Sequence, residues 1–308
     1  RDLHSFPTRR SSDLNAGALG TQHARLYSEI AKRNAGLYQF VGVFDTDNIR
    51  LRATAEKFGG GAFASAEEMT NFVDAVSVAT PTETHYEAVR VFLKHGKHVL
   101  IEKPITNSLS EAEELVALAR KNGCVLQVGH VERFNPVMRY LDEVLEEARF
   151  IEVHRLSPYP GRSTDIGVVL DLMIHDLDVV LSIVKSKLAK VDAVGIPVLS
   201  DSEDIANARL KFKNGCVANI TASRVSAERM RKIRIFGRTG HGAAYISLDY
   251  MNQVGELYRV ASEDAQETGL LKKLLAGKHA SIVSEYAGRK IVREPVPIEQ
   301  RSDRKSVV

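Results

Sequence analysis

Residues 15–20 have the sequence Asn-Ala-Gly-Ala-Leu-Gly and open a stretch of helical periodicity that ends near Asn34. A short apolar run at 40–44, Phe-Val-Gly-Val-Phe, follows and predicts a buried strand. A glycine turn that opens a helix and is followed by a parallel strand is typical of the first unit of a doubly wound sheet. This unit also needs a strand before the turn. Residues 1–14 show no strand pattern, so we expect the first strand to be missing.

The alternation of helix and strand continues to about Gly129, with helices that end at Gly96 and Gly123. Capping boxes at 65–68, 84–87 and 110–113 predict helix starts. The predicted strands are 40–44, 74–79, 98–101 and 125–128, with a further helix at 49–58. Short apolar strands separated by helices predict a Rossmann-type parallel sheet with helices on both faces.

Beyond Gly129 the pattern changes to a helix at 136–147, a strand at 150–156, a helix at 168–184 and several alternating runs between 191 and 258. This pattern predicts an α+β domain with a mainly antiparallel sheet. The expected fold class is therefore α/β. We expect a dinucleotide-type domain over 15–130 and an α+β domain over 131–300.

The two ends of the chain differ from the rest. SFPTRRSSDL near the start and RSDRKSVV at the end resemble translated sequencing-adapter read-through. We therefore expect residues 1–14 and 301–308 to be non-native tails, the alternative being native disordered tails.

Composition excludes several classes of protein. The hydrophobic fraction of 44% and the charged fraction of 26% are those of a soluble globular chain. The net charge of +3 comes from the two ends, so the body is neutral and we expect no nucleic-acid partner. No apolar run is long enough for stable membrane insertion. Cys124 and Cys216 lie far apart, which argues against a disulfide framework or zinc site and favours the cytoplasm.

Gly17 and Gly20 at the start of a helix suit a pyrophosphate, because the first backbone amides of a helix attract anions. A full fingerprint has another glycine where Asn15 stands, and asparagine tolerates a left-handed backbone. Asp45 follows the strand at 40–44, where an acid accepts hydrogen bonds from ribose hydroxyls and disfavours a 2′-phosphate. We therefore expect NAD rather than NADP as the cofactor. The alternative is that Asp45 only stabilises the turn after the strand.

Polar residues follow two further predicted strands. Thr80 and Pro81 come after 74–79, with His85 close behind, and Glu102-Lys103-Pro104 follow 98–101. Ligands of open α/β sheets bind at this carboxyl edge. A lysine placed there can polarise a carbonyl or exchange a proton, whereas the alternative is a surface lysine in a turn.

Asp171 and His175 lie four residues apart on a predicted helix, so they share one face. A carboxylate there can raise the basicity of the imidazole and fix its tautomer. The alternatives are a capped core histidine or a metal pair. No further His or Cys cluster completes a metal site, so we expect none.

Together, Glu102-Lys-Pro104 after Ala79-Thr-Pro81, and Asp171-Leu-Met-Ile-His175 downstream, resemble the glucose–fructose oxidoreductase / inositol dehydrogenase / rhizopine catabolism (Gfo/Idh/MocA) family over residues 15–300. The resemblance implies an NAD(P)-dependent dehydrogenase acting on a pyranose or cyclitol, with Lys103, Asp171 and His175 at the reacting carbon. The implied cofactor contacts are Asn15, Gly17, Ala18, Leu19, Gly20, Asp45, Thr80, Pro81, His85, Glu102 and Lys103.

Within this family, residues 128–136 (Val-Gly-His-Val-Glu-Arg-Phe-Asn-Pro) are similar to the branch that oxidises UDP-N-acetylglucosamine at C3 for amino-sugar or lipid A biosynthesis. This similarity implies that a set of polar residues contacts the substrate. The alternative, which the residues alone favour equally, is that they are solvated surface residues. The expected contacts are His130, Glu132, Arg133, Asn135, Arg155, Tyr159 and Arg162. Arginine forks at 155 and 162 would suit a diphosphate.

The alternating segment 232–236 predicts a sheet face that is solvated or faces another subunit, so we expect a homo-oligomer, a dimer or tetramer, through the C-terminal sheet. Two other functions remain open from the residues alone. One is a hydrolase that holds NAD permanently, and the other is a non-catalytic nucleotide-sensing module.

Overall fold

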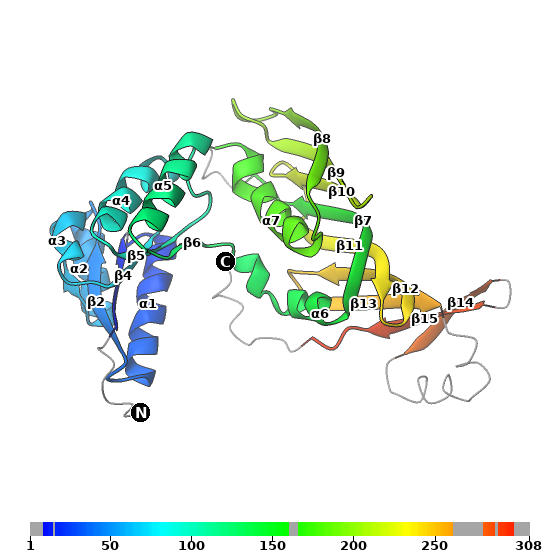
Figure 1. Cartoon of the computed structure of the whole chain (residues 1–308), viewed down its shortest axis with the longest axis horizontal. Helices are drawn as coiled ribbons and strands as arrows, with labels where there is room; N and C mark the ends of the chain where they lie inside the picture. The colour runs from blue at the N-terminus through cyan, green and yellow to red at the C-terminus, as the bar shows by residue number, and fades with distance from the viewer. Residues whose placement is uncertain (1–8, 15, 160–165, 261–279, 287–288, 299–308) are drawn as a thin grey trace. The chain divides into compact units, whose positions relative to one another are not determined.

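The computed structural model describes residues 9–14, 16–159, 166–260, 280–286 and 289–298. The chain divides into two compact units, Arg1–His130 and Val131–Val308 (Figure 1). The boundary falls where the predicted helix–strand alternation stops.

The first unit contains a six-stranded parallel sheet in the order β3-β2-β1-β4-β5-β6. Its strands are β1 Arg9–Leu14, β2 Tyr38–Phe44, β3 Gly61–Ala62, β4 Ala75–Val78, β5 His98–Ile101 and β6 Leu126–Val128. The strand order reverses between β1 and β4, and this is the point at which open α/β sheets bind their ligands. The predicted Rossmann-type sheet is confirmed.

The expectation that the first strand is missing is wrong. Arg9–Leu14 form β1 at the centre of the sheet, in parallel register with β2 and β4. Backbone N–H and C=O groups of the flanking strands need partners whatever side chains the partner strand carries. The polar sequence RRSSDL therefore fills the central position through its backbone. The carboxylate of Asp13 is fully buried in this strand.

Five helices flank this sheet: α1 Ala18–Arg33, α2 Asn48–Phe58, α3 Ala66–Thr70, α4 Thr82–Lys94 and α5 Leu109–Lys121. One core cluster joins α1 and α2 to β2 through Ala24, Val43 and Leu51, and a second joins α3, α4 and α5 to the sheet. These two separate clusters place the helices on both faces of the sheet, as predicted.

The predicted helix starts are confirmed at one capping box and corrected at two. Ser65 caps α3 by accepting a hydrogen bond from the Glu68 amide at 3.0 Å. In α4 the N-cap is Pro81, whose fixed φ of −56° starts the helix before Thr84. In α5 the cap is Ser108 rather than Ser110, and its hydroxyl accepts from the Glu111 amide.

The second unit is built on a nine-stranded sheet in the order β14-β15-β13-β12-β11-β7-β10-β9-β8. Its strands are β7 Leu145–Leu156, β8 Leu188–Ile196, β9 Ile205–Phe212, β10 Val217–Ser223, β11 Met230–Thr239, β12 Gly242–Asp249, β13 Val254–Val260, β14 Ser281–Tyr286 and β15 Arg289–Pro295. Neighbouring strands are antiparallel except for β7 and β10, which are parallel, so the mainly antiparallel sheet is confirmed.

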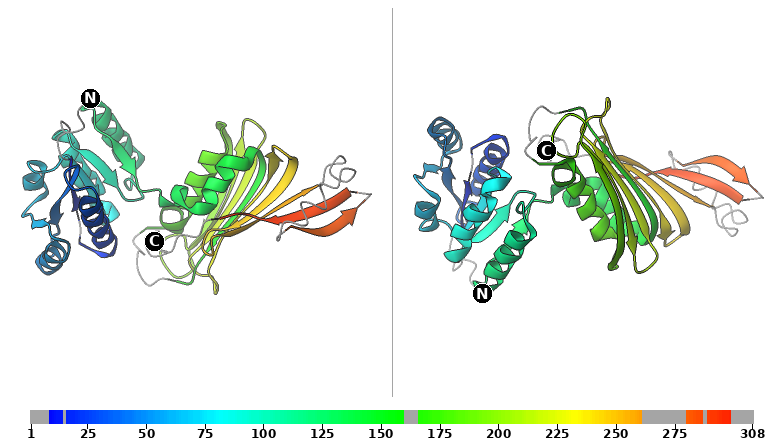
Figure 2. Two further views of the ribbon diagram at one scale, coloured as in Figure 1. Left: turned by 90° about the horizontal axis from the view of Figure 1, so that it is seen from below. Right: turned by 90° about the horizontal axis from the view of Figure 1, so that it is seen from above.

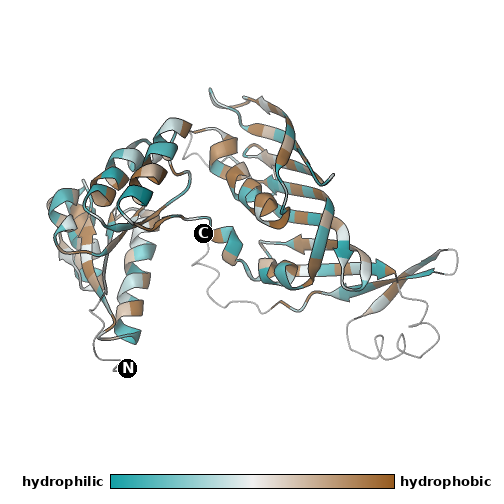
Figure 3. Cartoon of the chain, in the orientation of Figure 1, coloured by the Kyte–Doolittle hydropathy of each residue, from teal (hydrophilic) through white to brown (hydrophobic). Residues whose placement is uncertain are grey.

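Helices cover one face of this curved sheet (Figure 2). They are η2 Val131–Phe134, α6 Pro136–Val144, the π-helical turn η3 Val169–Met173 and α7 Ile174–Ile183. Alternate residues of β7 and β9 face the helices, and hydrophobic and hydrophilic bands accordingly alternate along the strands (Figure 3). The helix predicted at 136–147 ends earlier, because β7 starts at Leu145. The helix predicted at 168–184 begins with a π turn.

Candidate active site

The glycine turn stands at the start of α1. Gly17 is the N-cap and has no side chain with which to cap the helix, and the first turn carries no acidic residue. Ala18 and Leu19 are exposed, whereas Gly20 is buried in the helix. The amides of a helix's first turn lack partners within the helix and are partly positive. This end of α1 therefore fits a pyrophosphate, as the sequence predicts. Asn15 lies outside the described residues.

Asp45 follows β2 directly and is 6% exposed. Its Oδ2 accepts a hydrogen bond from the Ala16 amide at 2.7 Å, and its Oδ1 accepts from the Asp47 amide at 2.7 Å. The half-exposed Arg50 guanidinium lies 3.2 Å from Oδ1. The carboxylate therefore joins the end of β2 to the glycine turn. It stabilises a turn, which was the alternative role, and it lies beside the glycine turn, where the ribose contact is predicted.

His85 is the residue whose environment differs most from its predicted role. It is 1% exposed, and its ring nitrogens lie 2.8 Å from the carbonyl oxygens of Pro104 and Thr80. Both ring nitrogens thus bind the protein backbone and link two strand-end turns, so the structure gives no support for the expected contact with a cofactor. The hydroxyl of Thr80 is buried and has no hydrogen-bond partner among the described residues, as a ligand-facing group would.

Lys103 comes after β5 at the carboxyl edge and is half-buried. Next to it, Glu102 accepts a hydrogen bond from the Lys103 amide at 3.3 Å and packs against Gly129. Its other oxygen lies 3.3 Å from Nε2 of His23, a residue of α1 that sequence reasoning missed. The signal for His23 is its place three residues beyond Gly20 on the same helix.

The environment of His23 shifts its titration. Burial alone lowers the pKa of His23, but the carboxylates of Asp13 and Glu102 outweigh burial and raise this pKa to about 9. The imidazole is therefore a cation at neutral pH, enclosed between two acids of the first unit.

Asp171 and His175 belong to the second unit, whereas Lys103 belongs to the first. Asp171 lies in the π turn η3, and His175 is the second residue of α7. Both side chains are half-buried. Isolated π turns occur frequently at functional sites, because the extra residue alters which side chains share a face.

Three expected substrate contacts are buried with their polar groups bound to the protein, so this structure gives no support for that role. Arg155 is 3% exposed, and its guanidinium donates to Asp176 and Glu132. Glu132, in η2, is equally enclosed. Asn135 caps α6 by accepting from the Val137 amide. The alternation of β7 explains Arg155, which follows Ile151 and Val153 on the inner face.

The other expected substrate contacts lie nearer the surface. Arg133 is half-exposed and donates two hydrogen bonds of 2.6 Å to the carboxylate of Asp178. His130 and Tyr159 are half-buried, after β6 and β7 respectively, and Arg162 lies outside the described residues.

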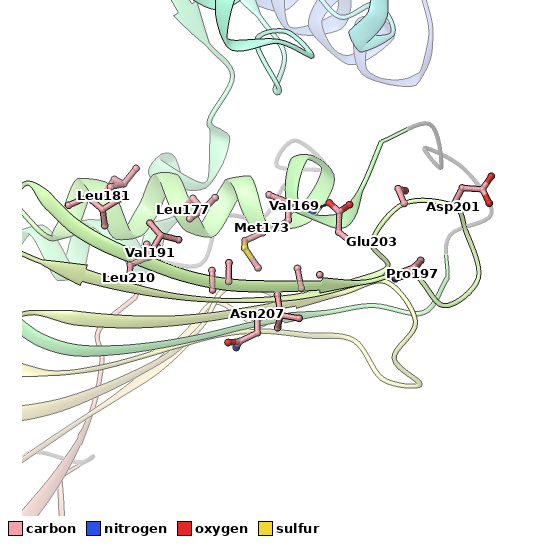
Figure 4. A pocket seen from close by; sticks show the side chains of 17 residues that line it. Val169, Met173, Leu177, Leu181, Val191, Pro197, Asp201, Glu203, Asn207 and Leu210 are labelled. Carbon is pink, nitrogen blue, oxygen red and sulfur yellow. Dashed lines mark hydrogen bonds between the residues drawn. The ribbon is translucent and has the colours of Figure 1, made fainter.

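An apolar groove of about 670 Å³ lies between the η3–α7 segment and strands β8 and β9 (Figure 4). Val169, Met173, Leu177 and Leu181 line it at helical spacing. Asp171 and His175 do not line it, so they occupy a different face of the helical segment. The groove is therefore separate from the predicted catalytic pair.

In the described part of the chain, no three His, Cys, Asp or Glu side chains gather as metal ligands. No helix among the described residues is long and apolar enough to cross a membrane.

Comparison with known proteins agrees with this geometry. Residues 16–130 match the oxidoreductase family with an NAD-binding Rossmann fold, GFO_IDH_MocA, and residues 145–242 match the GFO/IDH/MocA C-terminal domain. The chain is 38% identical over 250 residues to UDP-N-acetylglucosamine 3-dehydrogenase of Acidithiobacillus ferrooxidans, which covers 81% of this chain and 76% of the relative.

The chain is also 31% identical to myo-inositol 2-dehydrogenase of Thermotoga maritima, over 74% of this chain and 72% of the relative. A solved structure of the Acidithiobacillus ferrooxidans enzyme superposes with a TM-score of 0.82 at 33% identity, over 98% of this chain and 86% of that chain. The resemblance in the sequence is confirmed: the chain belongs to the Gfo/Idh/MocA family of NAD-binding oxidoreductases.

Proposed function

We propose that the protein oxidises the C3 hydroxyl of UDP-N-acetylglucosamine, with NAD as the electron acceptor. The observation that carries the substrate assignment is the 38% identity to the dehydrogenase of that name, over most of both chains. The Asp171–His175 pair at the start of α7 supplies the acid–base chemistry that such an oxidation needs.

The groups of the first unit that would hold the cofactor are the backbone amides at 17–19, Asp45 and the buried Thr80 hydroxyl. The bound nicotinamide supplies a hydride acceptor. Asp45 supports NAD over NADP, because its carboxylate would repel a 2′-phosphate beside the glycine turn.

His175 accepts the proton of the sugar hydroxyl, Asp171 orients the imidazole, and Lys103 stabilises the negative charge that develops on the sugar oxygen. His130, Arg133, Tyr159 and Arg162 are the proposed substrate contacts. Arg162 would hold the diphosphate.

The open face of the second sheet is the proposed contact between subunits of a dimer or tetramer. Phe150, Phe236, Tyr245 and Tyr258 form a row of ring contacts across four strands, with centroid separations of 4.6 to 5.9 Å. Phe236 is 41% exposed, and large rings of this kind are enriched at subunit contacts.

The test is turnover of UDP-N-acetylglucosamine with NAD by wild type and by His175→Asn, with NADH followed by absorbance. We expect the wild type to form NADH and keto-sugar in equal amounts. We expect His175→Asn to lose about 10²- to 10⁴-fold in turnover with NAD affinity unchanged. Sugar release without net NADH would indicate the hydrolase instead. Wild-type turnover in a folded His175→Asn protein would remove His175 from the mechanism.

A further inference from the structure

The start of α7 is tied to the rest of the second unit by two arginines. Arg155 of β7 donates from Nε and Nη2 to the two oxygens of Asp176, at 2.8 and 2.9 Å. Arg133 of η2 donates in the same forked manner to Asp178. Asp176 follows His175 directly, so the first of these forks binds the side chain of the residue next to the proposed proton acceptor.

The Arg155 site is fully enclosed and fully bonded. Arg155 and Asp176 are 3% and 1% exposed, and the third guanidinium nitrogen donates to Glu132 Oε1 at 3.0 Å. The remaining oxygen of Glu132 accepts from the Asn135 amide group at 3.3 Å. A planar guanidinium that donates to two carboxylates fixes both in direction as well as distance, which a point charge does not.

Stability alone is a weak reason for this triad. The cost of removing three charges from water offsets most of their mutual attraction, so well-packed apolar residues would serve a core equally well. What the fork defines is geometry. The segment before it is a π turn, in which one extra residue is accommodated, and α-helical hydrogen bonding resumes at Ile174. The forked hydrogen bonds of Arg155 to Asp176 fix the residue at which the π turn ends and the α-helix begins.

We propose that Arg155 is a positioning residue for His175, acting through Asp176: the fork sets the register in which the π turn gives way to α7, and hence the face on which Asp171 and His175 lie. This inference rests on the proposed role of His175. The hydrogen bonds and ion pairs of Glu132 among the described residues go to Arg155, Asn135 and Arg231 and not to α7, so we assign its contribution to stability.

The triad contains its own matched control. Asp176→Asn and Glu132→Gln each remove one carboxylate charge from the same arginine at similar burial, but only Asp176 adjoins His175. We expect Asp176→Asn and Arg155→Lys to lower kcat about 10- to 100-fold per folded molecule, since a small misplacement of a reacting group costs that much. We expect NAD affinity to be unchanged in both.

Glu132→Gln should lower the melting temperature to a similar extent while kcat stays within about 3-fold of wild type. Arg259→Met, which removes an ion pair with Glu294 Oε1 between β13 and β15, should leave kcat unchanged. Equal losses of kcat in Asp176→Asn and Glu132→Gln, or no loss in either, would overturn the inference.

A second readout does not depend on catalysis. Amide hydrogen exchange at 174–177 in the full chain should be faster in Asp176→Asn and Arg155→Lys than in Glu132→Gln at matched overall stability, and equal rates would also overturn the inference. Failure of the proposed function looks different. The wild type would then form no NADH from UDP-N-acetylglucosamine, while the exchange difference at 174–177 would persist.

Discussion

The two units each contain a fully buried aspartate, but only the one in the second unit accepts hydrogen bonds from another side chain. Asp13 in β1 is 0% exposed and Asp176 in α7 is 1% exposed. Asp176 receives a forked pair of hydrogen bonds from Arg155. The oxygens of Asp13 have no hydrogen-bond partner among the described residues, and His23 Nδ1 lies 3.8 Å away. Burial therefore raises the pKa of Asp13 to about 6.

The difference shows that backbone hydrogen bonds alone can place a strand in a sheet, whereas a buried polar side chain needs a hydrogen-bond partner of its own. The position of β1 between β2 and β4 satisfies the backbone ladder, and its neighbours are apolar strands such as Phe40–Phe44 and Ala75–Val78. The ion pair with His23 at 3.8 Å is the interaction that offsets part of the cost of burying Asp13, which no hydrogen bond offsets. This contrast shows that the backbone of Arg9–Leu14 fits the centre of the sheet, whereas the Asp13 side chain accepts no hydrogen bond there.

The largest expected effect comes from breaking the satisfied site. Arg155→Met leaves Asp176 and Glu132 buried without their cation, so we expect the free energy of unfolding to fall by about 3–5 kcal/mol. Urea unfolding of the variant and of wild type measures this. A loss below about 1 kcal/mol would mean that water or other groups replace the guanidinium.

Repairing the unsatisfied site should have the opposite sign. Asp13→Val removes a buried carboxylate that accepts no hydrogen bond and lies beside His23 of α1, so we expect a gain of about 3 kcal/mol. The melting temperature would rise by several degrees. The matched change Asp176→Val should destabilise, and a gain from both changes or from neither would contradict the contrast drawn here.

The ion pairs of His23 in the first unit should make the stability of the protein depend on pH. The pKa of His23 is raised to about 9, above the ordinary 6.5, so its contribution to stability is complete below pH 6.5 and is lost as the pH rises through 9. The size is about 2 kcal/mol. Melting temperatures between pH 6.5 and 9 should fall in wild type and change less in His23→Gln. A parallel decline in both proteins would assign the effect elsewhere.

A third buried carboxylate, Asp45, should give the smallest effect. Asp45→Ser removes the repulsion of a 2′-phosphate and leaves Arg50, 3.2 Å away in the wild type, to attract it. We expect the preference for NAD over NADP to fall by about tenfold, which is about 1.4 kcal/mol. Titration of both cofactors measures it, with Asp47→Ser as the control. An unchanged ratio would remove Asp45 from the ribose site.

The sequence predicts those parts of the molecule in which a local pattern decides the structure. Glycine turns and short apolar strands were sufficient for the parallel sheet, and alternation was sufficient for the second sheet. The strand at Arg9–Leu14 was not predictable, because its position comes from the backbone needs of strands that lie 30 to 70 residues further along the chain. The π turn was also missed, because one extra residue hardly changes a helical pattern.

Side-chain partners were the least predictable feature. Arg155 and Glu132 were placed at the substrate because charged residues near a strand end often face solvent or ligand. Their actual partners lie 21 and 23 residues apart in the chain, a separation that no local pattern encodes. The placement of Lys103, Asp171 and His175 around one substrate stays a prediction.

The parallel pairing of β7 with β10 has a consequence for how the protein is made. Phe150–Leu156 pair with Val217–Ser223, and the intervening chain carries α7 with His175 and then the β8–β9 hairpin. Closing that long loop costs chain entropy that only the finished sheet offsets. During synthesis, the helix that bears the proposed proton acceptor has its core only after residue 223 has left the ribosome. A nascent chain can therefore complete its dinucleotide domain well before it has any capacity for catalysis.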